Sequence, residues 1–140
     1  EREAQVGAFS AGYQELTTTL AAFHRGYDQW QGGEGECNRG AAVDSLGDFS
    51  ISFSRIAERA RQLPQATFLR PLGALLIEAA EVEVRALRGL RNEWRPFVSS
   101  VYGAFDGERD AAGKLRRQVA VGLQDLLARY QIPYDEVGTQ

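Results

Sequence analysis

Apolar side chains recur every third or fourth residue between Val6 and Trp30, with no position missed. This spacing places them along one face of an α-helix. The stripe consists of Val6, Phe9, Tyr13, Leu16, Leu20, Phe23, Tyr27 and Trp30. A helix of roughly 25 residues is about 38 Å long, and an apolar stripe of that length needs partners along all of it. The pattern predicts a first helix over residues 2–30.

Three further stripes with the same spacing follow, and they predict helices over residues 41–63, 71–94 and 99–131. The Gly-rich segment 31–40 separates the first two helices, Pro64 and Pro71 bracket the second turn, and Pro133 ends the last helix. Glu83 interrupts the third stripe, and Glu108 interrupts the fourth. The fourth stripe consists of Val98, Val101, Phe105, Glu108, Ala112, Leu115, Val119, Gly122 or Leu123, Leu126 and Tyr130.

The third turn has two candidate positions. Pro96 predicts a turn over residues 95–99. The alternative is a break between Gly103 and Gly107, with a long third helix kinked at Pro96. The apolar spacing continues through both positions, so it does not choose between them.

Four long amphipathic helices with short connections predict an all-α fold. We expect residues 1–140 to form a single domain, an antiparallel up-down-up-down four-helix bundle. The sustained spacing of 3.5 residues favours packing like that of a coiled coil.

The two glutamates within the stripes, Glu83 and Glu108, are the candidate site residues. A turn near Pro96 places them at similar distances from it, so they would face each other as a polar layer inside the bundle. Paired carboxylates in a bundle core can bind metal or share a proton. The alternative is that a small rotation turns Val82 inward and exposes both carboxylates to solvent. We favour this second interpretation because an unpaired buried charge is costly.

Other chemistry has little support in the sequence. The only histidine is His24, and no Glu-x-x-His motif accompanies it, so we expect no di-metal site. His24 could ligate a haem, but a packed or exposed ring is the favoured interpretation. Cys37, the only cysteine, has no histidine nearby in the sequence and is interpreted as incidental. We therefore predict no metal, no cofactor and no catalytic residues.

Charge is nearly balanced, with a formal net charge of −3. Basic residues recur on the third helix and cluster on the fourth, where acidic residues interleave with them, so a solvated, paired face is favoured over a surface for nucleic acid or anionic lipid. The basic residues concerned are Arg85, Arg88, Arg91, Arg95, Lys114, Arg116 and Arg117. No apolar run is long enough to insert into a membrane.

Trp30-Gln31-Gly32 falls between the first two predicted helices. It resembles the Trp-x-Gly turn of the small secreted helical-hairpin proteins named after that motif. The resemblance covers three residues, and this chain departs from the pattern in having four predicted helices and no Tyr-x-x-x-Asp/Glu tail. It implies, as one alternative, a secreted helical protein that self-associates.

Our leading expectation is a non-enzymatic bundle that binds a protein partner or a small ligand, as sensory and scaffolding bundles do. Arginine outnumbers lysine strongly, which is typical of GC-rich bacterial coding sequences. Because the chain begins at Glu1, we interpret it as a mature or trimmed piece, and we expect an extracytoplasmic domain of an anchored bacterial protein. The alternatives are a secreted protein that forms homodimers and a bundle enzyme or cofactor carrier that uses the core carboxylates.

Overall fold

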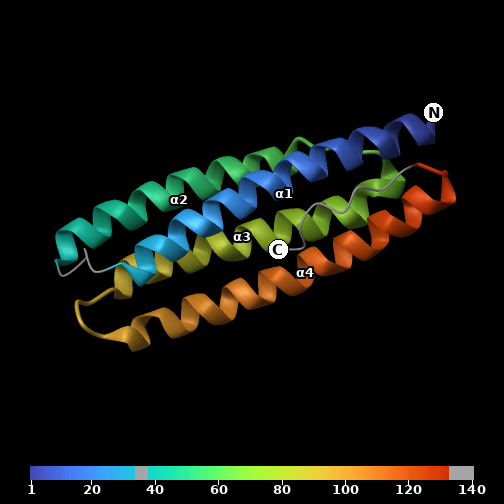
Figure 1. The fold of residues 1–140 in the computed structure, drawn as a ribbon. Helices are drawn as coiled ribbons and strands as arrows, with labels where there is room; N and C mark the ends of the chain where they lie inside the picture. The colour runs from blue at the N-terminus through green and yellow to red at the C-terminus, as the bar shows by residue number, and fades with distance from the viewer. Residues whose placement is uncertain (34–37, 133–140) are drawn as a thin grey trace.

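The computed structural model describes residues 1–33 and 38–132, and within them it shows four long helices and no strand. The long helices are α1 (Arg2–Gly32), α2 (Arg39–Arg61), α3 (Arg70–Glu93) and α4 (Tyr102–Arg129). Two short 3₁₀ turns, η1 (Thr67–Leu69) and η2 (Ser99–Val101), precede α3 and α4. The chain runs up, down, up and down, so α4 ends at the same end of the bundle as the start of α1 (Figure 1). The predicted all-α antiparallel four-helix bundle is confirmed.

The turns follow from local chemistry. Asn38 caps α2, since its side-chain oxygen accepts a hydrogen bond from the Ala41 N–H at 3.0 Å, and the helix therefore begins earlier than predicted. Pro71 lies in the first turn of α3. The third turn lies at Pro96, and Gly103 and Gly107 are inside α4. Of the two candidate positions for this turn, the structure selects the first.

The segment that resembles a Trp-x-Gly turn is helical. Trp30, Gln31 and Gly32 form the last turn of α1, and Gly33 follows as its C-terminal cap. Residues 34–37, which include Cys37, and residues 133–140 lie outside the described residues, as does the predicted stop at Pro133.

Side chains of different size fill different parts of the core. The backbone of α3 approaches those of α2 and α4 more closely than α1 approaches its neighbours. The buried faces of α2, α3 and α4 carry many small residues, among them Ala57, Ala60, Ala79, Ala80, Ala112 and Gly113. The first helix instead inserts large rings, including the fully buried Phe9 and Tyr27. The wider separation between α1 and its neighbours leaves room for long polar side chains where α1, α3 and α4 meet.

Candidate ligand-binding site between α1 and α4

A glutamate stands at the centre of the bundle. Glu83 of α3 is fully buried, with 0% of its surface exposed. Its position within the apolar stripe of α3 forces its side chain inward, among residues that cannot solvate a carboxylate. A charge in such a place must be paired. Oε2 of Glu83 shares a hydrogen bond with His24, and Oε1 faces the Arg116 guanidinium as an ion pair without an aligned hydrogen bond.

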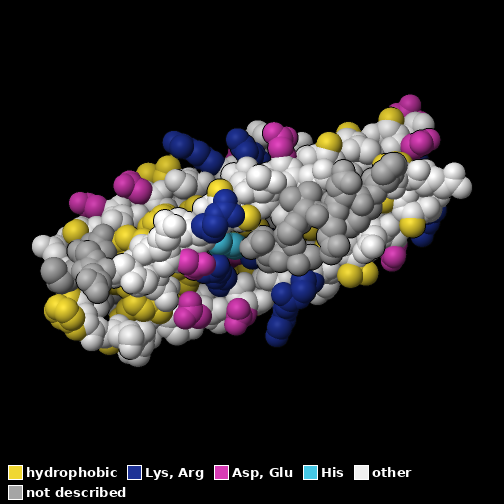
Figure 2. Space-filling model, viewed as in Figure 1, with side chains coloured by type: hydrophobic (Ala, Val, Ile, Leu, Met, Phe, Trp, Pro, Cys, Tyr) yellow, Lys and Arg dark blue, Asp and Glu magenta, His cyan; other side chains and the backbone are white. Residues whose placement is uncertain are grey.

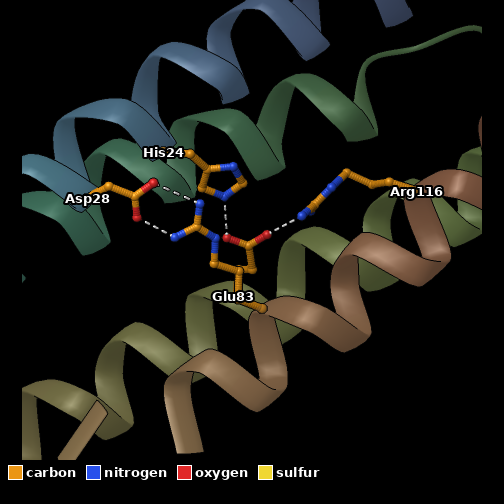
Figure 3. A network of polar contacts seen from close by, with 5 residues as sticks. His24, Asp28, Glu83 and Arg116 are labelled. Carbon is orange, nitrogen blue, oxygen red and sulfur yellow. Dashed lines mark hydrogen bonds and ion pairs between the residues drawn. The ribbon is translucent and has the colours of Figure 1, made fainter. Parts of the chain in front are cut away.

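The two partners of Glu83 come from different helices. His24 of α1 places Nε2 at 2.8 Å from Oε2, and Arg116 of α4 places Nη2 at 2.6 Å from Oε1 (Figure 3). Because a carboxylate only accepts hydrogen bonds, His24 Nε2 is the donor in this pair. The His24 ring lies near the rings of Phe23 and Phe53. Three helices thus meet through one carboxylate.

The pairing decides the ionisation of Glu83. Burial by itself raises the pKa of this carboxyl group, but the hydrogen bond from His24 and the positive charge of Arg116 outweigh burial. The net result is a pKa below the ordinary value of 4.5. Glu83 is therefore an anion at neutral pH, and it holds a cation in place beside it.

A second ion pair lies one helical turn away along α1. The Asp28 oxygens accept hydrogen bonds from Arg109 Nη1 at 2.6 Å and Nη2 at 3.2 Å, a two-pronged contact between α1 and α4. The hydrogen bond from Arg109 holds the pKa of Asp28 below its usual value. This pair is more exposed than the one at Glu83. The pair fixes the Arg109 guanidinium between α1 and α4.

Arg116 is the most constrained cation of the group. Its side chain is only 11% exposed, and Nη2 faces Glu83. Its buried Nε–H group has no hydrogen-bond partner among the described residues. Buried donors in folded proteins are nearly always satisfied by protein, water or ligand. Glu83 Oε1, which Arg116 Nη2 approaches to 2.6 Å as an ion pair, also accepts no hydrogen bond among the described residues. Arg116 and Glu83 therefore each keep one buried hydrogen-bonding atom unsatisfied.

A pocket of about 370 Å³ opens over this cluster between α1 and α4. Its lining consists of His24, Arg109, Asp110, Gly113, Lys114, Arg116 and Arg117. Figure 2 shows the histidine at the bottom of a hollow, with basic and acidic side chains around it. The four basic residues outnumber Asp110, Glu83 and Asp28 together, so the pocket keeps a positive field.

Of the two predicted site residues, the structure buries one and exposes the other. Glu83 lies in the core, whereas Glu108 is exposed on α4. The two glutamates do not form a buried pair, and the favoured alternative, in which both reach solvent, is wrong for Glu83. The reason lies in α4, whose inward-facing positions are Phe105, Arg109, Ala112, Arg116 and Val119, in the same 4, 3, 4, 3 spacing. The predicted stripe through Glu108 and Leu115 is displaced by one residue.

The structure places the residues that complete the site differently from the sequence-based prediction. The sequence predicts a solvated face for Arg116, whereas its side chain is mostly buried. His24 is packed in the core, as the favoured interpretation had it, but it also binds Glu83. One signal was present. Arg109 and Arg116 are seven residues apart, which is two turns of a helix, so their side chains leave α4 on the same face.

Within the parts of the chain that the structure describes, no group of three or more His, Cys, Asp or Glu residues could hold a metal ion. Nor is any helix of those parts both long and apolar enough to cross a membrane. Comparisons of the chain with protein-family models, curated proteins and solved structures find no match. The site must therefore be interpreted from its own chemistry.

Proposed function

We propose that this chain is a non-enzymatic helical-bundle domain that binds a small ligand through a phosphate or carboxylate group in the pocket between α1 and α4. The observation that carries the proposal is Arg116: a largely buried guanidinium, anchored by Glu83, with an unpartnered Nε–H group, lining a positively charged pocket. Guanidinium groups match the oxygens of such anions in both charge and geometry.

The anchoring carboxylates prepare the site for an anion. Glu83 and Asp28 hold Arg116 and Arg109 in place, so these side chains lose little freedom when a ligand arrives. Lys114 and Arg117 are exposed at the rim and add a field that draws an anion in. Gly113 contributes no side chain to the wall and keeps it open.

Binding is favoured over catalysis by the composition of the lining. The His24–Glu83 pair orients an imidazole, as in nucleophilic enzymes, but no serine, threonine or cysteine is among the described residues that line the pocket. Nε2 of His24 is already engaged by Glu83, which weighs against the cofactor-carrier alternative. A sensory role in an extracytoplasmic bacterial protein stays a prediction from the sequence.

Thermal unfolding in the presence of simple anions tests the proposal. Inorganic phosphate and acetate are titrated at constant ionic strength, because screening alone changes the stability of charged proteins. We expect the melting temperature to rise with ligand concentration in the manner of specific binding to the native state. Replacing Lys114→Gln and Arg117→Gln together should weaken this response at least several-fold.

The matched control is Arg55→Gln with Arg88→Gln, which removes the same two charges from exposed positions on α2 and α3. It should respond to phosphate as the unmodified chain does. Equal responses of both double variants, or no rise in melting temperature with either anion, would contradict an anion site in this pocket.

A further inference from the structure

The loop between α3 and α4 presents an aromatic side chain to solvent. Phe97 is 92% exposed, and its backbone has a φ of 62°, the left-handed region that bulky residues rarely adopt. Neither property benefits an isolated bundle. Burial of the ring would be favourable, and glycine would adopt this backbone conformation without strain.

The loop is nevertheless held firmly at its beginning. Trp94 is buried, its indole N–H donates to the Tyr102 hydroxyl at 2.9 Å, and its carbonyl accepts from Arg39 Nη1 at 2.5 Å. The position of Phe97 is therefore defined by contacts on its N-terminal side, and the ring is held outward at the end of the bundle.

A groove of about 540 Å³ runs between α3 and α4 near the same end. Its apolar floor includes the buried residues Ala86, Leu90 and Phe105. Gly89 on α3 and Ala104 on α4 leave it open, and a side-chain carbon added at Gly89 would meet no atom within 4 Å. Such a groove has room for one aromatic side chain from another molecule.

The loop and the groove are complementary in charge as well as in shape. Arg95 is exposed two residues before Phe97, and within the described residues it forms no ion pair. Beside its apolar floor the groove is lined by the carboxylates of Glu93 and Glu108 and by the guanidinium of Arg85, so its walls carry one net negative charge. An aromatic side chain with a neighbouring cation matches an apolar groove with acidic walls.

We propose that two copies of this chain form a symmetric dimer in which each Phe97 enters the α3–α4 groove of the other copy. Loop and groove lie at the same end of the bundle, so a two-fold axis near that end can satisfy both contacts at once. The groove lies between α3 and α4, whereas the anion pocket lies between α1 and α4. The dimer does not depend on the anion pocket, so either proposal can be wrong while the other is right.

The contact is small. Each of the two aromatic rings buries about 150–250 Å², and interfaces at the low end of the size range are weak and transient. We therefore expect a dimer that forms at micromolar or higher concentrations and dissociates on dilution. The charged walls also predict that the dimer weakens as salt concentration rises.

Sedimentation equilibrium over a range of concentrations, with a reducing agent to remove any disulfide through Cys37, tests the proposal with two variants. Phe97→Gly removes the ring and relieves the left-handed backbone, so the monomer should remain folded and become no less stable. Gly89→Leu fills the groove from within and replaces a helical glycine by a good helix former, so it too should fold. The control is Val121→Ala, which trims another exposed apolar residue on α4.

The expected result is a concentration-dependent dimer for the unmodified chain and for Val121→Ala, with the association constant at least tenfold lower in Phe97→Gly and in Gly89→Leu. A chain that stays monomeric up to millimolar concentration overturns the proposal. A dimer that survives either Phe97→Gly or Gly89→Leu also overturns it, because the contact would then lie elsewhere.

Discussion

Two neighbouring faces of α1 are buried against different kinds of side chain, one aromatic and the other ionic. Tyr27 contributes to an aromatic cluster, in which its ring centroid lies 4.7 Å from that of Phe105 and 5.5 Å from that of Phe49. His24, one turn earlier, joins the ionic cluster of Glu83 and Arg116. We use the names aromatic cluster for Phe23, Tyr27, Trp30, Phe49, Phe53 and Phe105, and ionic cluster for His24, Asp28, Glu83, Arg109 and Arg116.

The aromatic cluster contributes mainly to stability, whereas the ionic cluster contributes mainly to the proposed binding. Rings in the aromatic cluster gain free energy from burial in proportion to their apolar area. In the ionic cluster, desolvation offsets much of the attraction between charges, so the intact cluster contributes little net stability. What it provides is a set of cations held in fixed positions at a pocket. Removing a single member, however, leaves its partner buried and unpaired.

The largest expected effect is therefore the loss of Glu83. Glu83→Ala leaves Arg116 and His24 without their acceptor in the core, and it should destabilise the protein by about 3–5 kcal/mol. Urea unfolding monitored by circular dichroism measures the change. A loss under about 1 kcal/mol would show that the buried pair is not formed in solution.

Replacing the buried triad as a whole should cost much less. His24→Leu, Glu83→Leu and Arg116→Leu together remove the desolvation penalty along with the attraction, so the triple variant should regain roughly 2–4 kcal/mol relative to Glu83→Ala. It should also lose its response to phosphate. If the triple variant is no more stable than Glu83→Ala, the intact ionic cluster itself stabilises the fold, and the expectation of little net stability is wrong.

Acidification should weaken the ionic cluster and spare the aromatic one. The pKa of Glu83 is lowered by folding, so the unfolded state binds the proton more readily, and the resulting stability is present above the unfolded pKa and lost as pH falls through the folded value. Asp28, whose pKa is lowered by Arg109, acts in the same direction.

Unfolding free energies measured from pH 6 down to pH 3 should therefore decline more steeply for the unmodified chain than for Glu83→Gln. Glu108→Gln, at an exposed position, is the matched control and should follow the unmodified chain. Parallel profiles for the chain and Glu83→Gln would contradict the lowered pKa.

The smallest expected effect concerns the aromatic cluster. Burial raises the pKa of Tyr27, and its hydroxyl has no hydrogen-bond partner among the described residues. Tyr27→Phe removes this buried polar group while keeping the ring, so it should stabilise the protein by up to about 1 kcal/mol. The melting temperature measures it, and a clear decrease would mean that the hydroxyl is satisfied in solution.

Much of the fold could be predicted from apolar spacing, because four stripes of one period have few ways to pack. Periodicity predicts the start of α2 two residues too late, since the capping role of Asn38 is a local hydrogen bond that periodicity does not report. The site was predicted only at Glu83. A search for apolar residues passes over Arg109 and Arg116, which take inward positions because carboxylates on α1 and α3 neutralise them. Which charges meet depends on how the helices rotate against one another.

Phe97 shows a second limit of periodic patterns. Its residue type is ordinary for a core, and its exposure follows from a turn whose backbone angles are set by neighbouring contacts. The pattern of polar and apolar residues carries no information about such a loop.

Arg116 is the donor proposed to meet the anion, and its Nε–H resonance can be observed directly by ¹H–¹⁵N NMR. The peak is assigned by its absence in Arg116→Lys, and phosphate is titrated at constant ionic strength. We predict a saturable shift of the Arg116 Nε–H peak, at concentrations that leave the exposed Arg88 peak unmoved. An Arg116 peak that shifts no more than that of Arg88 would contradict the proposed binding site.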